Sequence, residues 1–448
     1  MRRYRRAWLL GLIALMPSID AAFAFGGMYV AKADSRLFNQ SSKVVFTRHD
    51  GKTVITMVND YQGALEEFAL VVPVPDVLER GQIHVMTDGA VVDHLDAYTA
   101  PRLLTRVDRD PCRTDAAEEG AGGGSMTAAG QGRADALGVS VDATYAVGEY
   151  DIVILAAEDS DGLATWLRSN GYRLPDGAEG TLADYVARGM RFVLARVDLK
   201  EQSKLGYSYL RPLQMAFESE NFVLPIRLGT SNAAGPQELS VYLLTHDGRV
   251  ETVNYPTATI PSDVELPLFV EDDVAAFYGA MFEAQAARTD RPAVFLEYAW
   301  DLSRCDPCTA DPLSLDELRE LGVFWLFEAG PPAGAMTSGV FVTRLHLRYD
   351  AGRFPDDLRF RESKDRSHFQ VRYALRRPWQ GEPRCEAARA YLKALPARFE
   401  EEAQNLARLT PWPIAEIRAK MEAGGQSFAP PQLLAADRKW WERLWPDD

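Results

Sequence analysis

The stretch that decides the fold class is residues 43–57, KVVFTRHDGKTVITM. Two runs rich in β-branched residues flank Asp50-Gly51, and an Asp-Gly pair between two such runs is the strongest short-range signal for a β-hairpin. A third run at 68–72 has the apolar composition of a buried strand. The sequence therefore predicts a β-rich N-terminal part, and the pattern continues outward from this hairpin.

Strands and helices are both predicted along the rest of the chain. Short apolar or alternating runs predict strands at 150–155, 192–197, 222–228, 239–245, 294–298, 340–349 and 369–375. Helical periodicity predicts inserted helices at 161–170, 181–188 and 271–285, and Ser314 and Glu317 form the capping box of another. Because strands are joined by hairpins as well as by helices, we expect an α+β fold with a mainly antiparallel β body.

The C-terminal part has a helical pattern. Two prolines and a glycine pair divide it into predicted helices at 386–395, 397–409, 413–423 and 433–444. The last of these has an apolar, Trp-rich face, which we interpret as docking onto the body; binding to a membrane or a partner is the alternative. The fold class predicted is thus an α+β body with inserted helices and a helical C-terminal region.

The first 24 residues have the layout of a secretory signal peptide. A basic segment at 2–6 precedes an apolar run at 7–16, and Ala22-Phe23-Ala24 supplies small residues for cleavage near Ala24. The apolar run is too short for a membrane-spanning helix, and no later segment is apolar enough to span a bilayer. The sequence predicts an exported protein, periplasmic or secreted, with no transmembrane anchor in the mature chain.

The chain is acidic. It has 49 Lys and Arg against 64 Asp and Glu, a formal net charge of −15. Such a surface repels phosphate backbones and anionic headgroups, so we expect no nucleic-acid partner. The partner predicted instead is an envelope protein or a ligand whose identity the sequence does not give.

Composition divides the chain into five predicted regions. These are a signal peptide at 1–24, an N-terminal β-rich region at 25–112, a Gly/Ala-rich flexible loop at 113–135, an α+β body at 136–384 and a helical C-terminal region at 385–448. The loop is not predicted to bind a nucleotide, because no strand precedes it and no Gly-Lys-Ser/Thr motif follows it.

Four cysteines, Cys112, Cys305, Cys308 and Cys385, are expected to be paired in the predicted oxidising compartment. We favour long-range bonds in which Cys305 and Cys308 reach separately to Cys112 and Cys385, because a Cys305–Cys308 bond closes a very short loop. A redox centre is disfavoured because Asp306 opposes thiolate formation and no helix begins at the pair. A four-thiolate zinc site is disfavoured by the compartment.

A second candidate site consists of His84, His94 and Asp96. On an extended strand His94 and Asp96 share one face, and together with His84 they would form an open metal site. The alternative is a polar cluster that satisfies turn and backbone groups. A metal-dependent hydrolase is the function that this site would support.

A third candidate lies on the predicted strand 340–349, where Arg344, His346 and Arg348 alternate with apolar residues. The alternation predicts one solvated face and one core face. An anion-binding basic strip is the functional alternative.

Several longer motifs resemble one bacterial family, called domain of unknown function 2330. They are YVAKAD at 29–34, LFN at 37–39, VVPVP at 71–75, HLDAYTAPRL at 94–103, LPIRLG at 224–229, EYAWD at 297–301, CDPC at 305–308 and FVTRLH at 341–346. The likeness covers most of the mature chain. It implies an exported bacterial protein. It implies no activity, because the family has none assigned.

The sequence leaves open whether the protein is an enzyme. It contains no Gly-x-Ser-x-Gly elbow, no His-Glu-x-x-His and no Walker motif, and we expect no cofactor. The function predicted first is a non-catalytic binding or interaction protein of the cell envelope. The alternatives are a metal-dependent hydrolase using the His84/His94/Asp96 region and a thiol-disulfide oxidoreductase at Cys305/Cys308.

Overall fold

The computed structural model describes residues 28–31, 38–62, 68–113, 143–155, 160–175, 177–198, 210–231, 235–304, 311–328 and 339–429. Four predictions fall outside these ranges. They concern the signal peptide, nearly all of the Gly/Ala-rich loop, the Cys305/Cys308 pair and the helix at 433–444.

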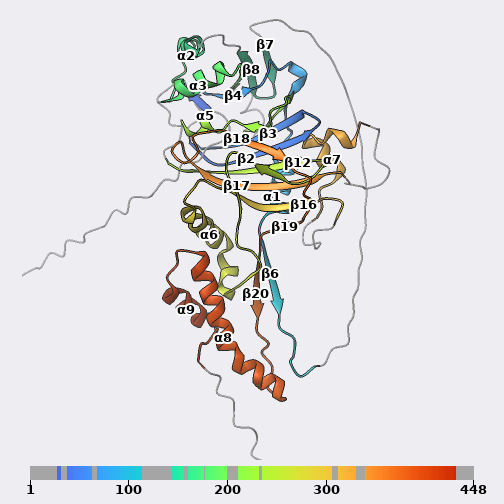
Figure 1. The fold of residues 1–448 in the computed structure, drawn as a ribbon, viewed down its shortest axis with the longest axis vertical. Helices are drawn as coiled ribbons and strands as arrows, with labels where there is room; N and C mark the ends of the chain where they lie inside the picture. The colour runs from blue at the N-terminus through green and yellow to red at the C-terminus, as the bar shows by residue number, and fades with distance from the viewer. Residues whose placement is uncertain are drawn as a thin grey trace, which may run out of the picture.

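The central layer is a nine-stranded mixed sheet with the order β14-β16-β17-β12-β2-β3-β10-β5, in which β19 also pairs with β16 (Figure 1). Its strands are β2 (Phe38–His49), β3 (Lys52–Gln62), β5 (Ile83–Val85), β10 (Leu213–Glu218), β12 (Gln237–Thr245), β14 (Thr257–Thr259), β16 (Val294–Asp301), β17 (Phe341–Tyr349) and β19 (Phe369–Gln370). The predicted hairpin is β2–β3. Asp50 and Gly51 both have positive φ, 47° and 76°, as the tight two-residue turn requires.

A five-stranded antiparallel sheet packs against one face of the central sheet. Its order is β1-β4-β9-β8-β7, with β1 (Met28–Ala31), β4 (Phe68–Val74), β7 (Ala143–Val147), β8 (Tyr150–Leu155) and β9 (Arg191–Val197). Alternate residues of both sheets form one shared core, for example Phe46 on β2 with Ile152 on β8. The outer face is covered by α2 (Ser160–Ser169) and α3 (Ala178–Ala187), the two helices predicted between these strands (Figure 1).

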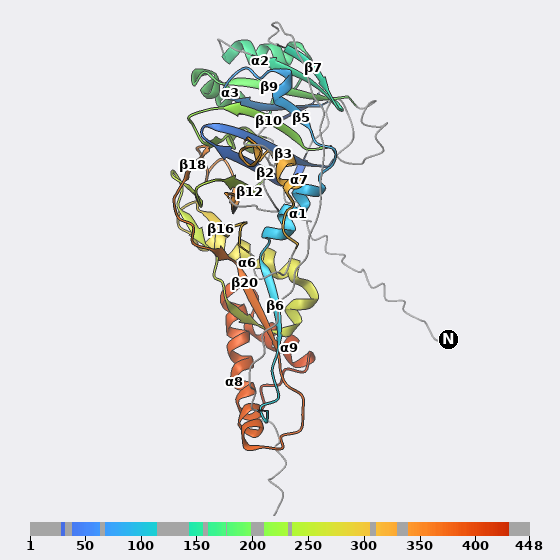
Figure 2. The same ribbon diagram turned by 90° about the vertical axis from the view of Figure 1, so that its right-hand side faces the viewer.

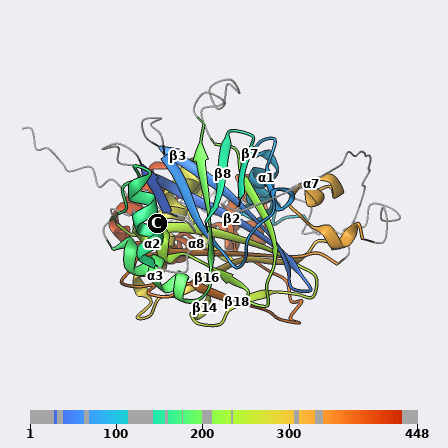
Figure 3. The same ribbon diagram turned by 90° about the horizontal axis from the view of Figure 1, so that it is seen from above.

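The other face of the central sheet is covered by helices. Val45 and Tyr242 point to this side and pack with α1 (Ala90–Thr99), α7 (Leu315–Glu320) and η3 (Phe324–Leu326). Seen from above, α7 lies at the periphery of the molecule beside α1 (Figure 3). The capping box predicted at Ser314 and Glu317 is present at the start of α7. Short strands β11 (Val223–Leu224), β13 (Val250–Thr252) and β18 (Leu358–Glu362) form a small separate sheet.

The helical C-terminal region lies at the opposite end from the five-stranded sheet (Figure 2). There α6 (Val274–Arg288), preceded by η2 (Leu268–Asp273), shares a core with α8 (Glu386–Leu409), α9 (Ile414–Ala423) and β20 (Arg372–Arg377). The parallel sheet β15-β20-β6 completes this end, with β15 (Val264–Leu266) and β6 (Arg102–Val107). The predicted α+β class, with a mainly antiparallel body and a helical C-terminal region, is confirmed.

Two predicted elements differ from the structure. Pro396 lies inside one continuous helix, α8, and does not divide it. The helix continues because Phe399, Ala403 and Leu406 are buried in the core, and this packing outweighs the hydrogen bond that proline cannot donate. The strand expected at 222–228 shrinks to β11, because Pro225 ends the ladder, and the short helix α5 (Arg227–Thr230) follows.

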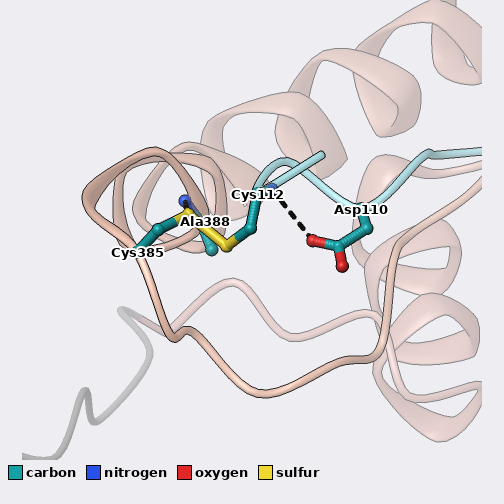
Figure 4. The surroundings of a disulfide bond; sticks show 4 residues. All are labelled: Asp110, Cys112, Cys385 and Ala388. Atoms are coloured by element: carbon teal, nitrogen blue, oxygen red, sulfur yellow. Dashed lines mark hydrogen bonds between the residues drawn. A yellow bond between two sulfur atoms is a disulfide. The ribbon is translucent and has the colours of Figure 1, made fainter. Parts of the chain in front are cut away.

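A disulfide joins Cys112, which follows β6, to Cys385, the N-cap of α8 (Figure 4). Their Cα atoms are 5.9 Å apart although the residues are 273 positions apart in sequence. The expected pairing of each with Cys305 or Cys308 is therefore wrong. The physical reason is that β6 and β20 are parallel neighbours. The segments that follow them, which lead to Cys112 and to Cys385, therefore begin at the same end of the sheet.

One carboxylate in the C-terminal region is buried without a strong cationic partner. Glu402 on α8 is 1% exposed, and Gln426 Nε2 donates to its Oε2 at 2.8 Å. Its closest cation is Arg398, whose Nε lies 3.4 Å from Oε1. Burial raises the pKa of Glu402 to about 7, against an ordinary value of 4.5, and the Gln426 hydrogen bond only partly offsets this.

Glu402→Gln is expected to stabilise the protein in mildly alkaline solution. Because the folded pKa exceeds the unfolded one, the native state holds the extra proton, and stability falls as pH rises from about 4.5 to about 7. The neutral amide removes this loss. The free energy of unfolding should therefore rise by roughly 1–3 kcal/mol at pH 8 and stay unchanged at pH 4. Urea unfolding at both pH values measures it. Glu401→Gln, on the exposed side of the same helix, is the control, and equal effects of the two variants would contradict the assignment.

Candidate functional site

An open pocket lies on the helix-covered face of the central sheet, near its β5 edge. Its volume is about 420 Å³, within the range of roughly 300–1,000 Å³ typical of small-molecule sites. Its floor carries Val54 of β3, Gln214 and Ala216 of β10, and His84 of β5. Strand register brings these side chains together, because Val54 pairs with Ala216 and Gln214 pairs with His84.

One wall of the pocket is the segment from Arg319, near the end of α7, to Glu328, which follows η3. Its lining residues are Arg319, Gly322, Phe324, Phe327 and Glu328. The segment is held to the sheet where Thr47 Oγ1 donates to the Leu321 carbonyl at 2.7 Å. Gly322 has a φ of 86°, and a Cβ there would lie 2.7 Å from Val54 Cγ1. Only glycine therefore allows this wall to approach the floor so closely.

The amide groups of the pocket are already oriented by the protein. Gln214 Nε2 donates to Thr56 Oγ1 at 2.8 Å and to the Glu320 carbonyl at 3.1 Å. Gln82, from η1 (Arg80–Gln82) on the opposite wall, donates to the Ala216 carbonyl at 2.9 Å. His84 is exposed, and within the described residues its ring makes no hydrogen bond or ion pair. His84 is therefore one lining group that a ligand can contact.

Aromatic rings and charges line the open side of the pocket. The Arg319 guanidinium lies 4.0 Å from the centre of the Phe327 ring, and Lys52 Nζ lies 5.6 Å from that of Phe324. Glu328 Oε1 is 3.3 Å from Lys52 Nζ. The mouth thus combines hydrophobic surface with charges of both signs, and it can bind an amphipathic molecule.

The structure does not bring His84, His94 and Asp96 together. His94 and Asp96 lie on helix α1 and not on the expected strand, while His84 lines the pocket on β5. Both His94 nitrogens are engaged, Nδ1 with Glu317 Oε1 at 2.6 Å and Nε2 with the Asp311 carbonyl at 3.0 Å. Nowhere in the described part of the chain do three or more His, Cys, Asp or Glu residues form a group that could hold a metal.

The bond between His94 and Glu317 has a structural role. Burial alone would lower the pKa of His94, but the hydrogen bonds that its ring donates to Glu317 and to the Asp311 carbonyl outweigh burial and raise the pKa above its ordinary value. Glu317 also completes the capping box of α7. The pair therefore ties α1 to α7 and so fixes the helix that leads into the pocket wall.

Arg344 and His346 of the basic strip on β17 are buried and Arg348 is half-buried, contrary to the solvated face that alternation predicted. Arg344 is 7% exposed and His346 is 6% exposed. Both point to the fully buried Glu297 on β16. Arg344 Nε lies 2.6 Å from Glu297 Oε2, and His346 Nδ1 lies 2.7 Å from Oε1. The prediction failed because the face is covered by α1 and α6, whose packing no local pattern on β17 encodes.

Glu297 occupies an irregularity in the sheet. The β16–β17 register shifts between Leu296 and Tyr298, so Glu297 is the extra residue of a bulge. Burial alone would raise the pKa of Glu297, but the charges of His346 and Arg344 hold it at about 2. Burial likewise opposes the charge of His346, and Glu297 raises its pKa to about 9. The carboxylate and both cations are therefore charged at neutral pH.

The buried pair belongs to a chain of alternating charges, here called the ion network. Its cations are Lys43, Arg344, His346 and Arg348, and its anions are Asp93, Asp96, Glu297 and Glu238. Asp96 connects Lys43 Nζ at 2.7 Å to Arg344 Nη1 at 2.8 Å. On the α6 side, Tyr278 donates to Glu297, and Phe282 stacks on His346 with ring centres 3.7 Å apart. The ion network thus holds α1 on the sheet through Asp93 and Asp96, and Tyr278 and Phe282 hold α6 against it.

Sequence reasoning missed Glu297, although a signal was present. It is the one charged residue between Val294 and Trp300, a stretch that is otherwise apolar and aromatic. A carboxylate inside a strand predicted to be buried requires a cation. Arg344 and His346 on the neighbouring strand are those cations.

Comparison with known proteins places the chain in a family. Residues 20–361 match the bacterial family described as "Uncharacterized protein conserved in bacteria (DUF2330)". The chain belongs to the DUF2330 family. This confirms the resemblance of the motifs. The DUF2330 match includes the pocket and the ion network, whereas Cys385, α8 and α9 lie beyond its last residue.

Other comparisons add little to the DUF2330 assignment. No curated protein matches the chain. Among solved structures, the one titled "Crystal structure of baculovirus P35" is similar over 74% of this chain and 99% of that chain, with 6% identity and a TM-score of 0.28. So low a score carries no argument about function. None of the helices in the described ranges has the length and apolar character to cross a bilayer.

Proposed function

We propose that this DUF2330 protein is an exported, non-catalytic binding protein of the bacterial envelope, and that the pocket lined by His84 is its binding site. The observation that carries the proposal is the pocket itself. It is open and fits a small molecule in size, and its histidine has no hydrogen bond within the described part of the chain. The signal-peptide pattern at 2–24 and the Cys112–Cys385 disulfide support export.

The distribution of acid–base groups supports binding without catalysis. Glu297 and His346 have strongly shifted pKa values, as catalytic groups often do. They lie beneath α6, however, and each is neutralised by a partner within the ion network. Charge balance of this kind is typical of a structural network.

A bulky side chain at Gly81 is expected to block the pocket. A Cβ at this lining residue would meet no atom within 4 Å, so Gly81→Trp can project into the pocket without a clash at its own position. The full-length chain is produced in bacteria, recovered from the periplasmic fraction and examined by native mass spectrometry. We expect the wild type to retain a small molecule and Gly81→Trp to lose it.

The matched control is Gly180→Trp on α3, where a Cβ also meets nothing within 4 Å but which is not part of the pocket. It should retain the molecule. Equal occupancy of the wild type and Gly81→Trp would rule out this pocket as the binding site. Recovery of the chain in the cytoplasm with its first 24 residues intact would rule out export.

A further inference from the structure

The charged side chains of the pocket lining suggest a class of ligand. The lining includes one arginine, Arg319, and one carboxylate, Glu328, together with the rings of Phe324 and Phe327; besides His84, the other lining residues are neutral. A ligand that matches this surface has an aromatic group and one charge of each sign.

Both pocket charges are free to change partners. Arg319 pairs with Asp316, and Glu328 pairs with Lys52. All four side chains are between 50% and 57% exposed. Ion pairs this exposed are weak, because water screens them and long side chains lose entropy when fixed. A ligand carboxylate and a ligand ammonium can therefore displace the present partners.

We infer that the pocket binds an aromatic zwitterion, namely an aromatic α-amino acid or a short peptide with both ends free. This inference rests on the proposed function. The ring packs against Phe324 and Phe327 above Val54 and Ala216. The carboxylate pairs with the planar, two-donor guanidinium of Arg319, and the ammonium pairs with Glu328. Both sources carry an aromatic ring, an ammonium and a carboxylate, but in a peptide the two charges are farther apart and an amide bond lies between them.

Calorimetric titration with defined probes tests the inference on the mature protein. The probes are phenylalanine, N-acetylphenylalanine, which lacks the ammonium, phenylalaninamide, which lacks the carboxylate, leucine, which lacks the ring, and the dipeptide alanylphenylalanine. We expect phenylalanine or the dipeptide to bind at least about tenfold more tightly than each probe that lacks a group, because each group makes a charged or aromatic contact. Tighter binding of the dipeptide identifies a peptide as the source, and tighter binding of phenylalanine identifies a free amino acid.

Two conservative variants assign each charge to its residue. Arg319→Gln should make phenylalanine and phenylalaninamide bind equally while the preference over N-acetylphenylalanine remains. Glu328→Gln should make phenylalanine and N-acetylphenylalanine bind equally, while the preference over phenylalaninamide remains. Arg384→Gln, which alters a remote exposed pair with Glu382, should change nothing. Selectivity that is the same in all variants overturns the inference.

The outcome also separates this inference from the proposed function. If no probe binds, but the protein keeps a molecule that Gly81→Trp abolishes, the ligand class is wrong and the binding site stands. If no probe binds and Gly81→Trp has no effect on any bound molecule, both proposals fail.

Discussion

Glu297→Ala is expected to destabilise the protein by roughly 3–5 kcal/mol, the range measured when one partner of a buried ion pair is removed. The variant leaves Arg344 and His346 charged and buried, with their shared carboxylate gone. Arginine keeps its charge in a protein, so Arg344 is left with Asp96 as its anionic partner, and His346 is left with Glu238, 3.8 Å away. The buried positive charge is then poorly compensated, and either this or an opening of the packing of α1 and α6 costs stability. The midpoint of urea unfolding, measured at constant slope, gives the loss directly.

The control for this prediction is Glu382→Ala, which removes an exposed partner of Arg384 and should cost no more than about 1 kcal/mol. The pH dependence gives an independent test. The folded pKa of His346, about 9, lies above its ordinary 6.5, so its stabilising contribution is complete below pH 6.5 and is lost as pH rises through 9. That decline should disappear in His346→Gln. A loss below 1 kcal/mol in Glu297→Ala would contradict a charged, buried carboxylate.

Local sequence signals predicted the elements of the fold well. The Asp50-Gly51 turn, the paired helices α2 and α3, and the capping box of α7 each depend on residues a few positions apart. Such features are determined by backbone conformation and by neighbouring side chains. The α+β class followed from them because it requires only the types of the elements and their order.

The sequence could not predict which helices cover which face of the central sheet, because these layers come from segments that are far apart along the chain. Alternation on β17 correctly divides its residues into two faces, but it does not say that α6 and α1 cover the face with Arg344 and His346. His94 is a different case, because a local signal was present: Val91, Leu95 and Tyr98 recur at helical spacing and are buried as α1.

The pocket was accessible to sequence reasoning only in part. His84 was singled out as a metal ligand, and the structure places it in the pocket without those partners. Its neighbours come from β3, β10 and the segment after α7, which are far apart along the chain. No spacing rule links Val54, Gln214 and Phe324, because the site is created by strand register and by the close approach at Gly322.

Replacing Cys112 and Cys385 together by serine is expected to cost roughly 2–5 kcal/mol, because the bond closes a very long loop in the unfolded chain. Urea unfolding of the double variant measures the loss. Wild type treated with a reductant should match the variant. If peptide mapping under non-reducing conditions joins Cys112 to a different cysteine, the pairing is wrong.

A second link lies next to this disulfide and should limit the local damage. Asp108, after β6, is bound by Arg376 of β20 and by Tyr391 and Arg398 of α8, with Asp108 Oδ1 lying 2.6 Å from Arg376 Nε. With the disulfide gone, this cluster still ties the N-terminal half of α8 to the end of β6. Asp108→Asn should therefore cost more in the serine background than in the wild type, by roughly 0.5–3 kcal/mol. Amide hydrogen exchange along α8 should show the extra loss confined to its N-terminal half, and strictly additive costs would mean that the two links act independently.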